Sequence, residues 1–161
     1  MRIEEYSDKY LEDCKDLLVE LEEYILTLDI DSLDRLHRDY RDKMFLCDYE
    51  EIKSNNGKVY LAIEDNKAIG LIMGIIVKYD SNDYLDYTCP KAGEITELVV
   101  SSKARGNNIG TKLMKKLEQY FKDNDCKWIH VDVFSYNIRG LNFYQKQGYH
   151  SRMNQMIKKV D

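Results

Sequence analysis

A glycine-bearing segment between an apolar strand and an amphipathic helix has the residue types that bind an anion. It runs from Val100 to Leu117, with Gly106 and Gly110 in its turn. The first amides of a helix have no intrahelical partner, and the helix dipole places about half a positive charge there, so main-chain groups alone can hold a phosphate. Glycine lets the main chain approach a ligand closely, and asparagine tolerates the positive φ that such turns need. The segment is therefore a candidate phosphate-binding loop.

The spacing of the glycines excludes the phosphate loop of nucleoside triphosphatases. That loop has four residues between its glycines and a lysine directly after the second. Here three residues separate Gly106 from Gly110, and Thr111 precedes Lys112. A plain connection between a strand and a helix is the other interpretation of the segment.

The segment resembles the acyl-CoA pyrophosphate loop of the GCN5-related N-acetyltransferases, the GNAT family. The signature of that family is Arg/Gln-x-x-Gly-x-Gly/Ala after a strand. Arg105 and Gly110 match this signature, whereas Asn108 stands in place of its first glycine. Asparagine is the next most permissive residue at such a turn.

A second motif of the same family is similar to residues 137–149. The family pattern is Asn-x-x-Ala-x-x-Phe-Tyr-x-x-x-Gly-Phe, and the chain has Gly140 for the alanine and Tyr149 for the phenylalanine. The resemblance covers residues 94–150. It implies an α/β (α+β) GNAT acyl-CoA N-acyltransferase fold, with residues 1–161 as a single domain. In that fold a mixed central sheet of six to seven strands is flanked by about four helices.

The resemblance also implies a site for acetyl-CoA. Main-chain groups at the strand end would hold the pantetheine arm and polarise the thioester. Those of the loop would hold the pyrophosphate, and one asparagine side chain would add a contact. The implied cofactor-binding residues are Leu98, Val99, Val100, Arg105, Gly106, Asn107, Asn108, Ile109, Gly110, Thr111, Asn137 and Tyr144.

Acetyl transfer to an amine needs a base for the amine and an acid for the departing thiolate. Tyr144 suits the acid because a phenol, with a reference pKa of about 10, keeps its proton at neutral pH. The family commonly uses a tyrosine there. Glu97 and Glu94 are the candidates for the base; strand alternation would place them on opposite faces, and of the two we favour Glu97. A core tyrosine and ordinary sheet acids are the alternative interpretation.

Charge is divided unevenly along the chain, whose net charge is −5. Residues 1–90 carry 11 Lys and Arg against 22 Asp and Glu, whereas residues 91–161 carry 13 against 7. The basic half suits coenzyme A, and the acidic half suits a cationic amine that the field of the protein steers. The resemblance makes Asp29, Asp31 and Asp34 candidate substrate-binding residues, with helix caps and surface acids as the alternative. Nucleic acid is not expected, since it needs clustered Lys and Arg.

These features predict an N-acetyltransferase that moves an acetyl group directly from acetyl-CoA to a primary amine, because no cysteine lies in either motif to carry the acyl group. An aminoglycoside, a polyamine or a protein amine would suit the acidic half. A non-catalytic acyl-CoA-binding regulatory domain is the alternative. The family forms monomers and homodimers, and the sequence does not choose between them.

The composition excludes several other classes. The four cysteines and three histidines are scattered with no C-x-x-C pair, so we expect neither a metal site nor a disulfide framework. No apolar run approaches the roughly 20 residues that cross a bilayer, and the first residues lack the apolar core of a signal peptide. We therefore expect a cytoplasmic protein with no membrane partner.

Hydrophobic periodicity predicts the elements that position these residues. Strands are expected at residues 2–6, 59–64, 68–79, 94–100, 128–134 and 149–159. A tight hairpin turn is expected around residues 65–67, and residues 80–92 are expected to form a loop. Helices are expected from Ser7 or Asp8 to Leu28, from Asp31 or Ser32 to about Tyr49, from Ile109 past Phe121, and through Leu141 and Tyr144 to a cap at Gly148.

Overall fold

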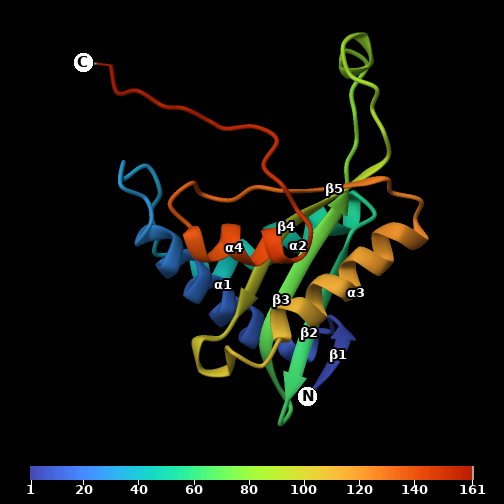
Figure 1. The fold of residues 1–161 in the computed structure, drawn as a ribbon. Coiled ribbons are helices and arrows are strands. Elements are labelled where there is room, and N and C mark those ends of the chain that lie inside the picture. Colours follow the sequence, from blue (N-terminus) through green and yellow to red (C-terminus); the bar gives the residue numbers. More distant parts are fainter. Residues whose placement is uncertain (161) are drawn as a thin grey trace.

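A computed structural model describes residues 1–160 and shows a five-stranded sheet with helices on both faces (Figure 1). The strands lie in chain order: β1 (Arg2–Glu5), β2 (Lys58–Glu64), β3 (Lys67–Ile76), β4 (Ala92–Val100) and β5 (Trp128–Val131). The helices are α1 (Leu11–Leu26), α2 (Tyr40–Ser54), α3 (Ile109–Asp123) and α4 (Ile138–Lys146). The first three strand pairs are antiparallel, and β4 and β5 are parallel because α3 forms the crossover between them.

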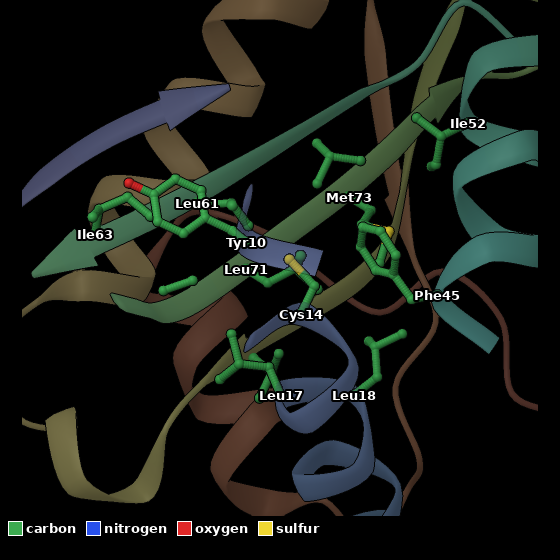
Figure 2. Packing of buried hydrophobic residues seen from close by; sticks show 13 residues of the cluster. Tyr10, Cys14, Leu17, Leu18, Phe45, Ile52, Leu61, Ile63, Leu71 and Met73 are labelled. Atoms are coloured by element: carbon green, nitrogen blue, oxygen red, sulfur yellow. The ribbon is translucent and has the colours of Figure 1, made fainter. Parts of the chain in front are cut away.

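Helices α1 and α2 cover one face of the sheet. Cys14 and Leu18 lie one turn apart on α1, and Phe45 and Ile52 lie two turns apart on α2, so each helix turns one stripe to the strands. Figure 2 shows these side chains packed against Leu61, Ile63, Leu71 and Met73 of β2 and β3. This layer holds the two helices from which acidic side chains reach the site.

Helix α3 covers the other face. Its predicted apolar stripe is confirmed, since Ile109, Leu113, Leu117 and Phe121 are all buried against the strands. The stripe fixes which face of α3 packs on the sheet, and the loop of residues 101–108 joins the end of β4 to its first turn. None of the helices within residues 1–160 is long and apolar enough to cross a membrane.

Two of the predicted turns are confirmed by their backbone angles. Asp65 and Asn66 have φ of 49° and 59°, the left-handed pair that a two-residue hairpin requires between β2 and β3. Gly148, with φ of 95°, follows the last turn of α4 and ends that helix.

The predicted last strand, residues 149–159, is wrong. Residues 149–160 form no strand or helix, and residues 150–160 are all exposed. The reason is the sheet: β5 has only four residues and pairs with β4 alone, so no strand within residues 1–160 receives the segment. The sheet therefore has five strands instead of the expected six to seven, whereas the four helices and the mixed sheet agree with the expectation.

The start of the second helix is also different from the prediction. Helix α2 begins at Tyr40, about eight residues after the expected cap. Ser32 has φ of 56°, outside the right-handed helical region, and the chain stays irregular up to residue 39. A loop of residues 27–39 thus separates α1 from α2.

A long connection, residues 77–91, joins β3 to β4 and is called the arm below. The loop was expected at residues 80–92, but β3 ends three residues earlier than expected, at Ile76, and β4 begins at Ala92. Figure 1 shows the arm extending beyond the end of the sheet. Tyr79 organises it: its ring contacts those of Tyr84 and Tyr87, and its hydroxyl donates to the carbonyl of Pro90 at 2.9 Å.

Candidate active site

Strands β4 and β5 part in the middle of β4. Their parallel pairing ends at Ile95 and Val131, but β4 continues to Val100. Beyond Ile95, the free edge of β4 has no strand partner within residues 1–160. Main-chain groups of residues 96–100 on that edge are therefore available to a ligand, except the carbonyl of Val100, which accepts from the Arg105 side chain. This stretch contains Leu98, Val99 and Val100.

A β-bulge lies at the same point. On β3, Met73 pairs with Glu97 and the next residue, Gly74, pairs with Ile95, so Thr96 is an extra residue in β4. The hydroxyl of Thr96 is buried and has no hydrogen-bond partner within residues 1–160. The extra residue shifts the alternation of side chains along β4 by one.

The shift brings both glutamates to one face, which makes the expectation of opposite faces wrong. Before the bulge, Ile95 packs in the cluster around α3, so Glu94 points to the face of α1 and α2. After the bulge, Leu98 packs in the α3 cluster and Val99 in the α1–α2 cluster, so Glu97 again points to α1 and α2. A regular strand would have separated the two carboxylates.

The loop after β4 leaves a row of amides without partners. Gly106 and Asn108 have φ of 89° and 57°, which turns the chain sharply into α3. Lys112 is the first residue of α3 whose amide donates to a carbonyl one turn back, that of Asn108 at 3.1 Å. Within residues 1–160, no amide of residues 106–111 donates a hydrogen bond. Six N–H groups at a helix N-terminus are thus free to meet an anion.

Side chains around the loop hold its shape. The Nε of Arg105 donates to the carbonyl of Val100 at 3.0 Å, and its Nη2 lies 3.7 Å from Oε1 of Glu20. The side-chain amide of Asn107 donates to the carbonyl of Ala104 at 3.3 Å. These contacts fix the two residues to the loop and leave its main chain to face outward.

Helix α4 is placed by its first residue and by a close contact with α3. Oδ1 of Asn137 accepts from the amide of Gly140 at 2.8 Å, which caps α4, and from the hydroxyl of Tyr24 at 3.0 Å, which ties α4 to α1. A Cβ on Gly110 would come within 3.3 Å of the Phe143 ring, so the glycine permits the close approach of the two helices. Asn137 thus positions the helix that carries Tyr144.

Tyr144 is half-buried between two other aromatic rings. The ring centroids of Phe143 and Tyr149 lie 5.3 and 5.7 Å from its own, both edge-on. Its hydroxyl has no hydrogen-bond partner within residues 1–160. Burial and then the charge of Glu97 raise the pKa of Tyr144 to about 12, so the phenol keeps its proton.

Glu97 is one of three acids that converge from different elements. Together with Glu22 of α1 and Asp48 of α2 it forms a cluster of acidic side chains, for which we use the name acidic pocket. Burial, followed by the charges of Asp48 and Glu22, raises the pKa of Glu97 to about 8. Burial and Glu51 raise the pKa of Asp48 to about 6. A cation bound beside these three carboxyls would stabilise their ionised form.

Two further features belong to the acidic pocket, an oxygen of Asp48 without a partner and the hydroxyl of Tyr40. Oδ2 of Asp48 is buried and has no hydrogen-bond partner within residues 1–160. Burial and then Asp34 raise the pKa of Glu22, while the Tyr40 hydroxyl acts in the opposite direction. Burial and the charges of Glu22, Glu97 and Asp48 raise the pKa of Tyr40, so its hydroxyl stays a hydrogen-bond donor.

The sequence analysis missed Glu22 and Asp48, although a signal was present. Glu22 follows buried Leu18 by four residues, and Asp48 lies three residues after buried Phe45 and four before Ile52. Acids on the apolar stripe of an amphipathic helix point inward. An inward acid on each of two neighbouring helices predicts a polar pocket between them.

The other candidate acids lie elsewhere. Glu94 is half-buried, and burial followed by Asp132 raises its pKa while His130 lowers it. Asp29 shapes the loop before α2, since its carboxylate accepts from the amides of Asp34 and Asp31 at 2.7 and 3.2 Å, and the first of these bonds lowers its pKa. Asp31 and Asp34 are exposed on that loop, and only Asp34 affects the acidic pocket, through Glu22.

Other clusters and hollows add no competing site. The described residues contain no group of three or more His, Cys, Asp and Glu placed to hold a metal ion. Surface hollows lie beside the β2–β3 turn and between Tyr49 and Tyr120, and no candidate residue lines either one.

Known proteins with related sequences are acetyltransferases. A profile described as the Acetyltransferase (GNAT) family matches residues 19–149. Glucosamine 6-phosphate N-acetyltransferase of Arabidopsis thaliana is 31% identical over 120 residues, which cover 74% of the chain and 78% of that protein. An uncharacterized N-acetyltransferase of Methanocaldococcus jannaschii is 34% identical over 94 residues, 58% of the chain, and the match spans only about half (53%) of that relative.

Solved structures share the whole architecture. A mutant of the BH1408 protein from Bacillus halodurans superposes with a TM-score of 0.84 at 18% identity, and the match covers 99% of each chain. An aminoglycoside N-acetyltransferase in complex with CoA superposes with a TM-score of 0.70 at 15% identity, again over 99% of each chain. At these identities the likeness concerns the fold. The family profile covers most of the chain, and the protein therefore belongs to the acetyltransferase (GNAT) family.

Proposed function

We propose that the protein transfers an acetyl group from acetyl-CoA directly to a cationic primary amine. One observation carries the proposal: Tyr144 packs in the same cluster as Leu98, the neighbour of Glu97 on β4, and the charge of Glu97 contributes to the raised pKa of Tyr144. This would place an acid and a base on either side of the position that a thioester would occupy between the strands.

The main chain suits the carrier of the acetyl group. The free amides of residues 106–111 would hold the pyrophosphate, and the open edge of residues 98–100 would hold the pantetheine arm. This arrangement directs the thioester into the gap between β4 and β5. One of the exposed amides there would donate to the carbonyl oxygen as it gains negative charge.

The side chains then supply the proton transfers. Glu97 accepts a proton from the ammonium of the substrate, through water, and the neutral nitrogen attacks the acetyl carbon. The carbon–sulfur bond breaks, and Tyr144 donates its proton to the departing thiolate. The second proton lost by the nitrogen returns to the Tyr144 oxygen, so the only net proton released is the one on Glu97, which passes to solvent. A base with a pKa near 8 is stronger than an ordinary carboxylate, which makes it better matched to an ammonium ion.

The acidic pocket supports a cationic acceptor. Asp48 and Glu22 lie beside the base, and Asp48 has a buried oxygen without a partner. A second ammonium group on the substrate would donate a hydrogen bond to that oxygen and lower the pKa values of the carboxyls in the acidic pocket. Polyamines and aminoglycosides carry such a second amine. Asp29, Asp31 and Asp34 on the neighbouring loop would add to the attraction of a cationic substrate.

The function is tested by thiol release from acetyl-CoA across matched pairs of diamines and monoamines. We expect turnover with diamines and a higher KM for monoamines of the same length. Release with neither class, together with tight binding of coenzyme A, would instead identify a non-catalytic acyl-CoA-binding domain.

Asp48→Asn should raise the KM for a diamine about tenfold and leave the KM for a monoamine nearly unchanged. The reason is the loss of one charge from the pocket, about 1.4 kcal/mol of binding free energy. Asp42→Asn is the matched control, because Asp42 lies on the same helix but is exposed. Equal effects of the two substitutions on both amines would contradict the assignment of Asp48 to the acceptor site.

Asn108→Asp should weaken the binding of coenzyme A about tenfold, since it places a carboxylate beside the pyrophosphate position, a cost of about 1.4 kcal/mol. The same carboxylate at a helix N-terminus stabilises α3, so the melting temperature should not fall. Asn108→Gly is the control, because glycine also adopts φ of 57° and adds no charge. Calorimetric titration with coenzyme A measures both variants, and an unchanged affinity of the Asp variant would remove the loop from the site.

A further inference from the structure

Helix α4 carries Tyr144 on a short element that packs lightly on the rest of the fold. It has nine residues, Ile138–Lys146, and none of them is fully buried. Contacts with neighbouring elements therefore decide where the hydroxyl of Tyr144 lies. The two ends of α4 differ in how they are held.

The second half of α4 has several anchors on α3. The Phe143 ring packs against the buried cluster of that helix. The side-chain amide of Gln147, directly after α4, donates to the hydroxyl of Thr111 at 3.4 Å. Two residues further along, the hydroxyl of Tyr149 donates to Oε1 of Glu118 at 3.1 Å. Loss of one of these contacts leaves the others in place.

The first end of α4 has one anchor, the hydroxyl of Tyr24 near the end of α1. That hydroxyl donates to Oδ1 of Asn137 at 3.0 Å, and the same oxygen accepts from the amide of Gly140 at 2.8 Å. Within residues 1–160, no other hydrogen bond joins residues 137–141 to another helix or to the sheet. Figure 1 shows the first turn of α4 beside the end of α1. One hydroxyl therefore fixes this end of the helix.

Gly140 permits the shape of this anchor. The Asn137 side chain folds back over the first turn of α4, so a Cβ on Gly140 would lie 2.6 Å from its Nδ2 and 2.8 Å from its Cγ. The GNAT pattern has alanine at this position, and alanine would push the Asn137 side chain away. The glycine of this chain is thus matched to the contact between Asn137 and Tyr24.

Helix α1 is in turn tied to the candidate phosphate-binding loop. Oε1 of Glu20 accepts from the amide of Ser102 at 2.5 Å and lies 3.7 Å from Nη2 of Arg105. Glu20 and Tyr24 are four residues apart, so they lie on the same face of α1. One side of α1 therefore contacts both the loop proposed to hold the cofactor and the helix that carries Tyr144.

We infer that Tyr24 is a positioning residue, which holds Tyr144 at the distance from the thioester that proton donation needs. Its hydrogen bond fixes the first end of α4 against α1, and Glu20 fixes α1 against the loop. Without the hydroxyl, α4 keeps its anchors on α3, but its first turn is free to move away from α1, and Tyr144 moves with it. The inference rests on the proposed function of Tyr144 as the acid.

Tyr24→Phe should lower kcat for acetyl transfer about tenfold and leave the KM for acetyl-CoA within about twofold, because a small displacement of the acid slows the chemical step. The amides proposed to hold the pyrophosphate do not depend on Tyr24. Thiol release from acetyl-CoA measures both constants.

Tyr120→Phe is the matched control for the loss of one hydroxyl. The Tyr120 hydroxyl donates to the carbonyl of Asn56 at 2.6 Å, near the other end of α3. This variant loses a hydrogen bond between elements, as Tyr24→Phe does, and should keep its kcat.

A double-mutant cycle separates positioning from a general loss of structure. If Tyr24 acts through Tyr144, adding Tyr24→Phe to Tyr144→Phe should lower kcat by less than about twofold further. A further loss of the full size would mean that the two residues act independently, and an unchanged kcat in Tyr24→Phe alone would mean that catalysis does not need its hydrogen bond. Either result overturns the inference and leaves the proposed function in place.

Failure of the proposed function would have a different signature. An unchanged kcat in Tyr144→Phe alone, or no acetylation of any amine by the wild-type protein, would overturn the proposed role of Tyr144 and the inference with it.

Discussion

Replacing Tyr144 with phenylalanine should lower kcat for acetyl transfer about 10²–10³-fold and leave the affinity for coenzyme A within about twofold. The phenol keeps its proton because burial and Glu97 hold its pKa at about 12, so the departing thiolate can take the proton from it. The ring itself packs between Phe143 and Tyr149, and phenylalanine preserves that packing. Thiol release measures kcat, and calorimetric titration measures the binding of coenzyme A.

Tyr149→Phe is the matched control for the loss of a hydroxyl. Tyr149 stacks edge-on against Tyr144, but its hydroxyl donates to Oε1 of Glu118 at 3.1 Å, on α3. We expect this variant to lose some stability and to keep its kcat. An unchanged kcat in Tyr144→Phe would remove Tyr144 from proton transfer, whatever the control does.

Glu97→Gln should lower kcat/KM about 10²-fold, because glutamine cannot accept the proton of the ammonium group. The wild-type protein should also show a rise of kcat/KM as the pH increases toward 8, since the carboxyl must first lose its own proton. The variant should lack this rise, so that only the ionisation of the substrate amine should still change kcat/KM with pH. A rise of equal size in both proteins would exclude Glu97 as the base and direct attention to Glu94.

The same variant should be more stable than the wild type at high pH. The pKa of Glu97 is raised to about 8 in the folded protein, above the value of about 4.3 in an unfolded chain. Its contribution to stability is therefore present below pH 4 and is lost as the pH rises through 8, when a buried charge forms. At pH 8.5 we expect Glu97→Gln to gain at least about 1.4 kcal/mol, or about 3 °C in melting temperature. A loss of stability at that pH would indicate that Glu97 is already ionised and paired.

The sequence predicts those parts of the fold that depend on local patterns. The stripe from Ile109 to Phe121 repeats every helical turn, so it identifies both the helix and its buried face. The turn at Asp65 and Asn66 follows from residue types that tolerate positive φ. The candidate phosphate loop is predicted on the same kind of local pattern, since its glycines and asparagines lie within one short segment.

The parts that sequence reasoning missed depend on residues far apart in the chain. Whether residues 149–159 form a strand is decided by a neighbouring strand, which the composition of the segment does not reveal. The acidic pocket joins Glu22, Asp48 and Glu97 from three elements. The helical stripes indicate that Glu22 and Asp48 point inward, but only the packing of α1 and α2 on β4 brings them to Glu97. The bulge at Thr96 is invisible to alternation, because the pairing with Met73 and Gly74 creates it.

The extra residue at position 96 divides β4 into two parts, and the alternation of side chains between the two faces of the sheet differs by one residue between these parts. When the role of a residue is transferred from a related protein, residues 92–95 must be aligned by their pairing with β5. Residues 97–100 must be aligned by their distance from Arg105. If β4 were aligned as a regular strand through the bulge, every residue assignment beyond Thr96 would be displaced by one position. Deleting Thr96 would restore regular alternation along β4 and leave Glu94 and Glu97, then two residues apart, on the same face of the strand.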